Sequence, residues 1–421
     1  MDMKKSQEKM HKYMNAYRKN WHLSASILIK NNDDVIFEET YGMANMEWNV
    51  PISYDTKFLI GSITKQFTAM AIMILVERGM ISLDDKLNKY IPAFTQNAEK
   101  ITIHHLLTHT SGINDFISDN WFNQKISKLK YEHKEFVSFF NYLPLESIPG
   151  EKFKYNNTGY YLLGVIIEQI SEKPFDSFIK ENIFGPIKMN NSGLLNENDI
   201  VPNIAHGYEF NIDKLENPTY MDSSKLLYFG GVYSTLRDLS LYDKALYSEE
   251  IVTKDSINKI YTTFKNNYGY GWFINEKFKS KCVSHSGGGC GFTTNIDRYI
   301  EKGIFIGILS NCGSLGVESI CNDLASILFE ESYNIPLKPK SIKIDTSNLK
   351  DYVGLYKDSN SNFYIKVTMK NEKLYMRYFD FNDFEIYPIG DGCFQHSLIN
   401  QRYDFNKDED GNVTLWGFSK K

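Results

Sequence analysis

Three short motifs in this chain combine residue types that could carry out nucleophilic catalysis. In chain order they are Gly61-Ser62-Ile63-Thr64-Lys65, Tyr155-Asn156-Asn157 and His285-Ser286-Gly287-Gly288. Together they offer a hydroxyl, an amine, a phenol, an amide and an imidazole. A serine hydroxyl is a weak nucleophile at neutral pH and needs an adjacent base to activate it. The set therefore predicts acyl transfer by an activated serine.

The surroundings of Ser62 distinguish it from the other Ser-x-x-Lys matches, which begin at Ser6, Ser127, Ser177, Ser256 and Ser347. Apolar residues precede Ser62 and recur after it at helical spacing, which predicts a buried helix that begins there. Lys65 then lies one turn beyond Ser62 on the same side. A helix N-terminus also favours developing negative charge. We expect Ser62 as the nucleophile and an enclosed Lys65 as a neutral base, or as a cation that lowers the pKa of a neighbouring hydroxyl.

The second motif follows a Pro149-Gly150 turn and leads into a predicted helix. Asn156 or Asn157 can cap that helix. An isolated Tyr-x-Asn is typical of a packed aromatic residue beside a helix cap. Its position between the other two motifs favours Tyr155 as the phenol of an active site.

The third motif reads as a strand, a glycine-rich turn and a second strand over residues 281–296. Glycine allows a backbone to approach a ligand closely. A strand beside the nucleophile could donate a backbone N–H group to the oxyanion of acyl transfer. A glycine-rich hairpin with a surface histidine is the alternative if the motif stood alone.

Together the three motifs resemble those of serine β-lactamases and penicillin-binding carboxypeptidases, closest to class C β-lactamases and their relatives among esterases and D-amino-acid peptidases. The resemblance covers roughly residues 20–335 and extends to residues 106–112, 229–239, 268–272 and 308–311. It implies a role for each motif residue. Ser62 would be acylated, Lys65 and Tyr155 would share the proton transfers, and Asn157 would hydrogen-bond the substrate amide and Lys65. His285, Ser286, Gly287 and Gly288 would line the substrate site, and the backbone N–H groups of Ser62 and Gly288 would form the oxyanion hole.

One departure from the family pattern bears on the substrate. Members that handle penicillin carry Lys-Thr-Gly where this chain has His285-Ser286-Gly287. An unperturbed histidine titrates near ~6.5 and binds a carboxylate weakly when it is neutral. We therefore expect a serine hydrolase that acts on a small ester, a D-amino-acid peptide or a related amide. The alternatives are a class C-like β-lactamase and a penicillin-binding sensor or ligand-binding protein without turnover.

Other site chemistries lack their sequence markers. There is no Gly-x-Ser-x-Gly elbow, P-loop or dinucleotide fingerprint. His104 and His105 have no third ligand at metal spacing, so we expect neither a metal nor a cofactor. We interpret His109 and Ser111 as part of a structural loop. The net charge of −5, with Lys and Arg dispersed, argues against a nucleic-acid partner and leaves a small molecule or peptide as the substrate.

The order of predicted elements indicates an α+β fold. Strands are expected over residues 24–30, 35–41, 268–275, 282–286, 293–299 and 303–310, with helices over much of 62–185 and over 315–331. Strands at both ends suggest one antiparallel sheet with helices packed on it and the active site between them. Residues 1–335 form this predicted β-lactamase-like domain. Residues 336–421 contain many short strands, which predict a small lipocalin-like β-barrel.

The remaining composition concerns the compartment and the assembly. Five cysteines spread over 421 residues do not form a disulfide framework, although a Cys282–Cys290 bridge is conceivable. Residues 1–9 show no secretory signal, and no apolar run reaches the ~20 residues of a membrane span. We expect a cytoplasmic protein, or an extracytoplasmic one if the N-terminus was trimmed. A homo-oligomer is compatible with the sequence.

Overall fold

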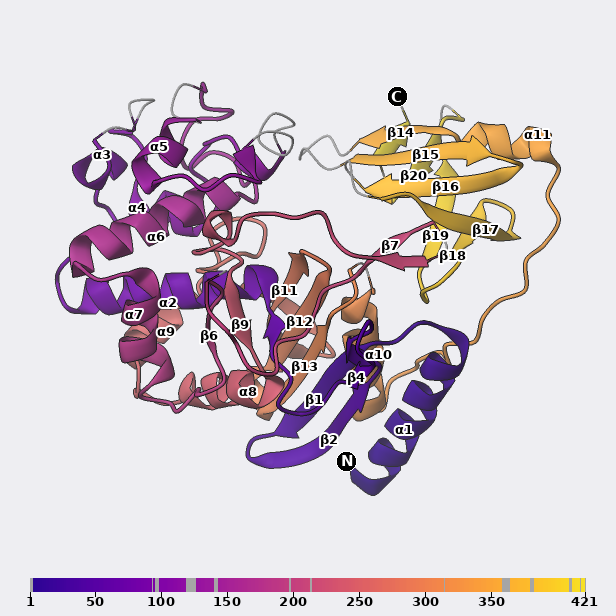
Figure 1. Cartoon of the computed structure of the whole chain (residues 1–421), viewed down its shortest axis with the longest axis horizontal. Coiled ribbons are helices and arrows are strands. Elements are labelled where there is room, and N and C mark those ends of the chain that lie inside the picture. The colour runs from indigo at the N-terminus through magenta and orange to yellow at the C-terminus, as the bar shows by residue number, and fades with distance from the viewer. Residues whose placement is uncertain are drawn as a thin grey trace.

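The computed structural model describes residues 3–420 except 93, 95–97, 119–125, 140–142, 197, 213, 314, 358–363, 379–381, 409–410 and 417. Its centre is a six-stranded sheet of order β10-β11-β12-β13-β1-β2, in which every pair of neighbours is antiparallel. Helices cover this sheet, and a closed barrel of eight strands lies beside it (Figure 1). The predicted α+β fold, with helices packed on one antiparallel sheet and a C-terminal barrel, is confirmed.

Both ends of the first 310 residues contribute to the sheet. The strands are β1 (Ala25–Asn31), β2 (Asp34–Tyr41), β10 (Phe273–Lys277), β11 (Ser280–Gly289), β12 (Phe292–Tyr299) and β13 (Ile304–Ser310). β1 pairs with β13 from Ala25 opposite Ser310 to Asn31 opposite Ile304. The strand expected from residue 268 begins later, at Phe273. Gly271 has a φ of +77°, and its α-carbon lies so close to α2 that a Cβ would stand 2.9 Å from the Lys65 carbonyl oxygen.

Side chains of β13 alternate between two cores, as the period of two in a strand requires. Ile304, Ile306 and Ile308 join the cluster that contains residues of α1 (Met3–Asn20) and α10 (Val317–Leu328). Phe305 and Leu309 join the cluster of the helical region on the other face. The expected amphipathic helix at the start of the chain is therefore present as α1, and its buried residues pack against the body of the protein.

The helical region holds the first two motifs and covers one face of the sheet (Figure 1). Its helices are α2 (Thr64–Glu77), α3 (Leu87–Tyr90), α4 (Ile103–Leu107), α5 (His133–Ser138), α6 (Asn157–Ser171), α7 (Phe175–Ile179), α8 (Leu236–Ala245) and α9 (Lys254–Ile260), with shorter turns η1 (Gly61–Ile63), η2 (Phe116–Ser118), η4 (Lys180–Phe184) and η5 (Ser223–Lys225). The turn η6 (Ile300–Lys302) joins β12 to β13 in the sheet. Small strands complete it: β3 (Met43–Asn45) pairs with β4 (Val50–Pro51), and β9 (Val232–Ser234) lies between β5 (Phe58–Leu59) and β6 (Gly193–Leu194). α2 is buried on nearly every side, because it runs through the middle of this core.

The barrel follows the linker, α11 (Thr346–Leu349) and η7 (Lys350–Tyr352). Its strands are β14 (Gly354–Lys357), β15 (Tyr364–Lys370), β16 (Lys373–Tyr378), β17 (Phe384–Gly390), β18 (Cys393–His396), β19 (Arg402–Lys407), β20 (Val413–Leu415) and β21 (Phe418–Lys420). A hairpin of β7 (Glu209–Asn211) and β8 (Lys214–Glu216) reaches it from the part of the chain that precedes the linker (Figure 1). At its turn, the Ile212 N–H group donates to the Asp383 carbonyl at 2.5 Å.

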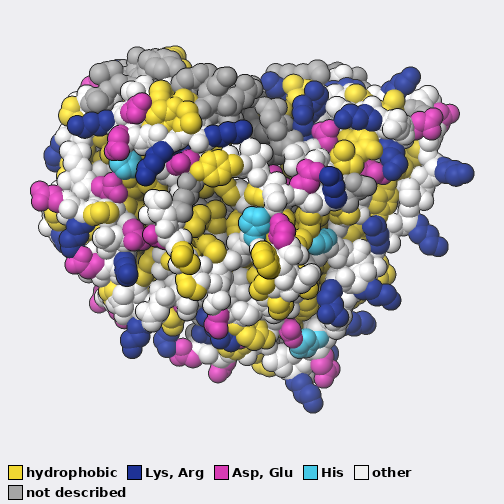
Figure 2. Space-filling view, viewed as in Figure 1, with side chains coloured by type: hydrophobic (Ala, Val, Ile, Leu, Met, Phe, Trp, Pro, Cys, Tyr) yellow, Lys and Arg dark blue, Asp and Glu magenta, His cyan; other side chains and the backbone are white. Residues whose placement is uncertain are grey.

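Three further properties of the fold are its surface charge, the state of its cysteines and the apolar character of its helices. On the face shown in Figure 2, Lys and Arg side chains are interspersed with Asp and Glu. All five cysteines are free, so the conceivable Cys282–Cys290 bridge is absent. Among the residues that the structure describes, no helix has both the length and the apolar character needed to cross a membrane.

Candidate active site

Ser62 lies in η1, a single turn that leads directly into α2. Two close backbone approaches fix this turn against β11. Gly61 has a φ of +55°, and a Cβ there would stand 2.7 Å from the Gly288 nitrogen. A Cβ on Gly287 would stand 2.1 Å from the Ile60 carbonyl oxygen. Only glycine fits both positions, so the first and third motifs are brought into backbone contact.

Lys65 is fully buried one turn beyond Ser62, as its spacing predicts. Its Nζ atom lies 3.0 Å from Ser62 Oγ, 2.8 Å from Asn157 Oδ1 and 3.2 Å from the Phe229 carbonyl oxygen. Burial lowers the pKa of Lys65 well below its ordinary value, because a charged amine loses solvation there. The carboxylate of Asp115 acts in the opposite direction and raises that pKa.

Tyr155 borders the same space from the loop before α6. Lys65 Nζ lies 4.8 Å from the centre of its ring. The Tyr155 hydroxyl is buried and makes no hydrogen bond of ordinary geometry with the described residues, although Ser62 is near enough to lower the pKa of this phenol. Burial has the larger effect and raises the pKa of Tyr155 above its usual value. The phenol is therefore protonated at neutral pH.

Asn156 and Asn157 have different tasks at the start of α6. Asn156 is the cap, because its side chain accepts a hydrogen bond from the Gly159 N–H group at 2.7 Å. Asn157 is the first helical residue, and its side chain bridges Lys65 and Asp115. The sequence allowed either asparagine as the cap, and the structure selects the first.

Asp115 is the site residue that sequence reasoning missed. Its carboxylate accepts from the Asn157 N–H group at 2.9 Å, from Asn157 Nδ2 at 3.1 Å and from the Thr158 N–H group at 3.3 Å. Burial raises the pKa of Asp115, and the hydrogen bonds from Asn157 oppose that effect. One signal existed in the sequence, because Asp115 comes shortly after residues 106–112, a segment to which the motif resemblance extends.

His285 is buried in β11, with 2% of its surface exposed. Its Nδ1 atom lies 2.6 Å from the Ser286 carbonyl oxygen, so Nδ1 carries a proton. Its Nε2 atom lies 3.3 Å from the Tyr268 hydroxyl and can accept from it. Burial, helped by the nearby Lys65, lowers the pKa of His285 to about 3. The histidine is thus neutral, and does not titrate near ~6.5 as an unperturbed side chain would.

The end of β11 presents an open edge. β10 pairs with β11 only as far as Ser284, whereas β12 pairs with it through to Gly289. Beyond Ser284, no described strand pairs with β11 on the β10 side. Ser286 is half-buried in this stretch, and Gly288 is exposed.

The other histidines of the helical region have structural partners. His105 completes a capping box with Thr102, and His104 Nδ1 lies 2.8 Å from the Tyr270 hydroxyl. His109 Nδ1 accepts from the Asn156 N–H group at 3.1 Å, while its ring packs 4.4 Å from that of Tyr155. Among the described residues, no group of three or more His, Cys, Asp or Glu side chains could hold a metal ion.

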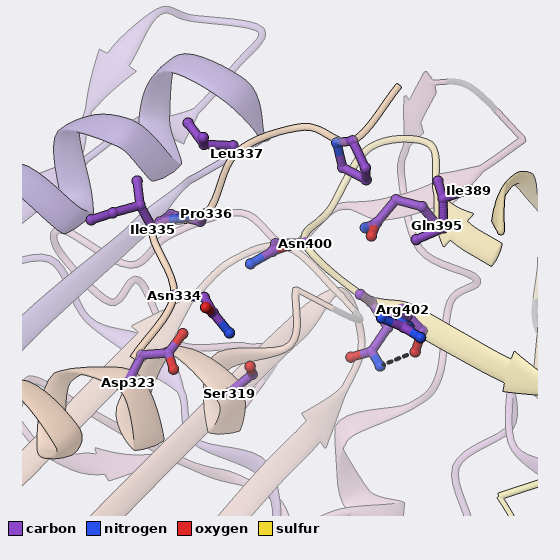
Figure 3. A pocket seen from close by; sticks show the side chains of 12 residues that line it. Ser319, Asp323, Asn334, Ile335, Pro336, Leu337, Ile389, Gln395, Asn400 and Arg402 are labelled. Carbon is purple, nitrogen blue, oxygen red and sulfur yellow. Dashed lines mark hydrogen bonds between the residues drawn. The ribbon is translucent and has the colours of Figure 1, made fainter. Parts of the chain in front are cut away.

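A cavity of about 460 Å³ lies elsewhere, between α10, the linker and the barrel (Figure 3). Asp323, Asn334, Gln395 and Arg402 are among the residues that line it. None of the motif residues borders this cavity. The candidate active site is therefore identified by the geometry of its side chains and not by the volume of a hollow.

Residues 8–325 match the family model described as Beta-lactamase. The chain belongs to the beta-lactamase family. The match includes all three motifs and stops short of the barrel. Within the family, the chain is 30% identical over 423 residues to Penicillin-binding protein 4* of Bacillus subtilis (strain 168), which covers 92% of this chain and 91% of that protein.

Solved structures agree with the family assignment. An octameric penicillin-binding protein homologue from Pyrococcus abyssi is 28% identical, with a TM-score of 0.68 and 99% of each chain covered. D-amino acid amidase from Ochrobactrum anthropi SV3 is 21% identical and has a TM-score of 0.68, with 78% of this chain and 99% of that one covered. The second likeness is one of fold.

Proposed function

We propose that the protein is a serine hydrolase that forms a covalent acyl-enzyme at Ser62 and acts on a small ester, a D-amino-acid peptide or a related amide. The observation that carries this proposal is the 3.0 Å contact between Lys65 Nζ and Ser62 Oγ, in a place where Lys65 is fully buried. A nucleophile beside an enclosed amine is the arrangement that acyl transfer needs.

The contacts of Lys65 favour it as the base. A neutral amine has two N–H groups and one lone pair. The two carbonyl-type acceptors, on Asn157 and Phe229, can take both N–H groups, which leaves the lone pair directed at the Ser62 hydroxyl. The lowered pKa of Lys65 agrees with this state. A protonated lysine in the same place could only donate to Ser62 and would not activate it.

Tyr155 is suited to return the proton to the leaving group. The pKa of Tyr155 is raised, so the phenol holds its proton at neutral pH. Its hydroxyl lies close enough to Ser62 for Ser62 to affect the pKa of this phenol. After Lys65 removes the Ser62 proton, the oxygen attacks the acyl carbon. The proton then passes to the leaving oxygen or nitrogen by way of Tyr155, and water repeats the sequence to release the acid.

Backbone groups supply the electrostatic part of the mechanism. We assign the oxyanion hole to the N–H groups of Ser62 and Gly288, because Gly61 and Gly288 are in backbone contact. The open edge of β11 beyond Ser284 can hydrogen-bond an extended acyl group. A neutral His285 offers no cation for a substrate carboxylate, which favours esters and amides with an uncharged group at that position.

Intact-protein mass spectrometry with parallel measurement of product release tests the proposal. Wild-type protein is mixed with a p-nitrophenyl ester, a D-Ala-D-Ala peptide or a penicillin. We expect Ser62-dependent adducts and turnover of the ester or peptide, with slow or absent turnover of penicillin. A persistent penicillin adduct without any turnover would instead identify a penicillin-binding sensor, and rapid penicillin turnover a β-lactamase.

Two variants make the result specific to the site. Ser62→Ala removes the nucleophile and should abolish adducts and labelling by a fluorophosphonate. Ser177→Ala is the matched control, because Ser177 and Lys180 form the same Ser-x-x-Lys pattern on an exposed part of the helical region. Labelling that survives in Ser62→Ala would move the nucleophile elsewhere and defeat the proposal.

A further inference from the structure

Asp115 determines which way the Asn157 amide points. The Asp115 carboxylate can only accept hydrogen bonds when it is ionised. Asn157 gives it two donors, the backbone N–H group and Nδ2, at 2.9 Å and 3.1 Å. With Nδ2 held by the carboxylate, Oδ1 is the atom that faces Lys65 Nζ, at 2.8 Å. The amide cannot rotate by half a turn without directing a donor at Lys65 and an acceptor at Asp115.

The orientation matters for the proton that Lys65 must take. An Asn157 oxygen accepts one Lys65 N–H group and so leaves the lone pair available for Ser62. An Asn157 N–H₂ group in that place would compete for the same lone pair. Asp115 therefore acts on the Ser62 hydroxyl through two side chains, those of Asn157 and Lys65.

We infer that Asp115 is a positioning residue for the reaction at Ser62: it fixes the orientation of the Asn157 amide and sets the charge that Lys65 experiences. This inference rests on the proposed function, and it adds a residue outside the three motifs. Asp115 is the only acidic group among the described residues that is identified as acting on the Lys65 charge.

The neighbours of Lys65 define what a pH profile can report. The titratable groups that face it come from four segments: Tyr155 before α6, Tyr160 in α6, His109 after α4, and His285 in β11. Both histidines have pKa values lowered by burial and by Lys65, and both phenols have raised ones. Asp115 remains as the group whose negative charge opposes the loss of the Lys65 proton.

An exchange of the carboxylate and the amide between positions 115 and 157 tests the inference. In Asp115→Asn the new N–H₂ group meets Asn157 Nδ2, so one of the two amides must rotate. The alternation of donor and acceptor from residue 115 through Asn157 to Lys65 is then lost. In the double variant Asp115→Asn with Asn157→Asp, the order is restored. Asn at 115 still accepts from the backbone N–H groups of residues 157 and 158, and its N–H₂ group donates to the new carboxylate, which accepts from Lys65.

The readout is the rate of fluorophosphonate labelling at Ser62 as a function of pH. We expect Asp115→Asn to slow labelling by about 10²-fold, as expected from a misplaced catalytic group. The double variant should recover at least about tenfold of this loss. The carboxylate of the double variant lies nearer to Lys65 and favours the protonated amine. The acidic limb of the pH profile, where labelling slows as Lys65 gains a proton, should therefore move to higher pH by about one unit or more. In Asp115→Asn the acidic limb should move to lower pH, because the charge that raises the Lys65 pKa is gone.

Controls separate this outcome from a loss of structure. Asp222→Asn is matched, since the Asp222 carboxylate is also buried and accepts from a backbone N–H group, that of Ser224, at 3.0 Å. It should change the melting temperature without moving the acidic limb. Equal labelling by wild type and Asp115→Asn, or a double variant as slow as the single one with an unmoved limb, would overturn the inference. Absence of Ser62 labelling in the wild type would defeat the proposed function itself.

Discussion

The Tyr268 hydroxyl lies 3.3 Å from His285 Nε2 and holds the third-motif histidine in one tautomer. Nδ1 donates to the Ser286 carbonyl, so Nε2 is the unprotonated nitrogen and accepts from the Tyr268 hydroxyl. The candidate site thus carries a neutral hydrogen-bonding group at the position where the sequence resemblance implies a lysine in members that handle penicillin.

His285 should not contribute a pH dependence near neutrality. Its pKa is lowered to about 3, so its charge would appear only in acid well below the working range. We expect the ratio of kcat/KM for a peptide with a free carboxylate to kcat/KM for its C-terminal amide to stay flat from about pH 5 to about pH 9. The separate values should fall together on the acidic side, as Lys65 gains the proton that prevents it from acting as a base.

His285→Gln provides the control for this prediction. Glutamine keeps one donor and one acceptor but cannot become a cation, so the same flat ratio is expected. A ratio that declines through pH ~6.5 in the wild type, and not in the variant, would show that a protonated histidine binds the carboxylate after all.

Gly287→Ala should disable the site through backbone displacement. A Cβ at this position would stand 2.1 Å from the Ile60 carbonyl oxygen and 2.4 Å from Thr294 Oγ1. The turn that carries Ser62 must then move away from β11. We expect kcat/KM for an ester to fall by about 10²-fold and the melting temperature to drop, measured by steady-state kinetics and calorimetry.

Gly288→Ala is the comparison, because the nearest atom to its Cβ would be the Phe292 carbonyl oxygen at 3.8 Å. The variant also keeps the backbone N–H group assigned to the oxyanion hole. Its losses should be much smaller than those of Gly287→Ala. Equal losses in the two variants would contradict the close contact between Ile60 and β11.

Ile212→Pro should weaken the attachment of the barrel. Ile212 donates its N–H group to Asp383, accepts from the Glu385 N–H group, and has a φ of +61°. Proline has no N–H group and requires a φ near −65°. Destabilisation on the order of 2 kcal/mol is expected, together with faster proteolysis of the linker around residues 334–340.

Ile212→Gly is the control for the proline variant, because glycine keeps the N–H group and the positive φ that proline loses. Glycine adopts a positive φ without the steric cost that a β-branched residue bears, and it keeps the N–H group. Stability within about 1 kcal/mol of wild type is expected. If the proline variant melts and resists proteolysis as the wild type does, the hairpin does not hold the barrel.

Local patterns predicted those parts of the molecule that local forces determine. Short apolar runs bounded by turns in residues 24–41 and 293–310 predicted strands, and the apolar spacing after Ser62 predicted α2, because these segments are buried in the core. The Ser62–Lys65 contact followed from helix geometry. Asp115 did not, because its contact with Asn157 depends on how two loops meet. The neutral state of His285 depended on burial by Tyr268 and on Lys65, neither of which its own neighbours in sequence reveal.

The pairing of β1 with β13 also determines when the central sheet can form during synthesis. Ala25 and Ser310 are register partners, so the ribosome must release almost the whole hydrolase-like region before the centre of the sheet can close. Until then the hairpin of β1 and β2 has an unpaired edge with Ile27 and Ile29 unburied, which is the kind of segment that associates with other chains. Pairing between such distant segments is also slow. The same connection that buries this edge in the finished protein makes the nascent chain dependent on protection while it waits.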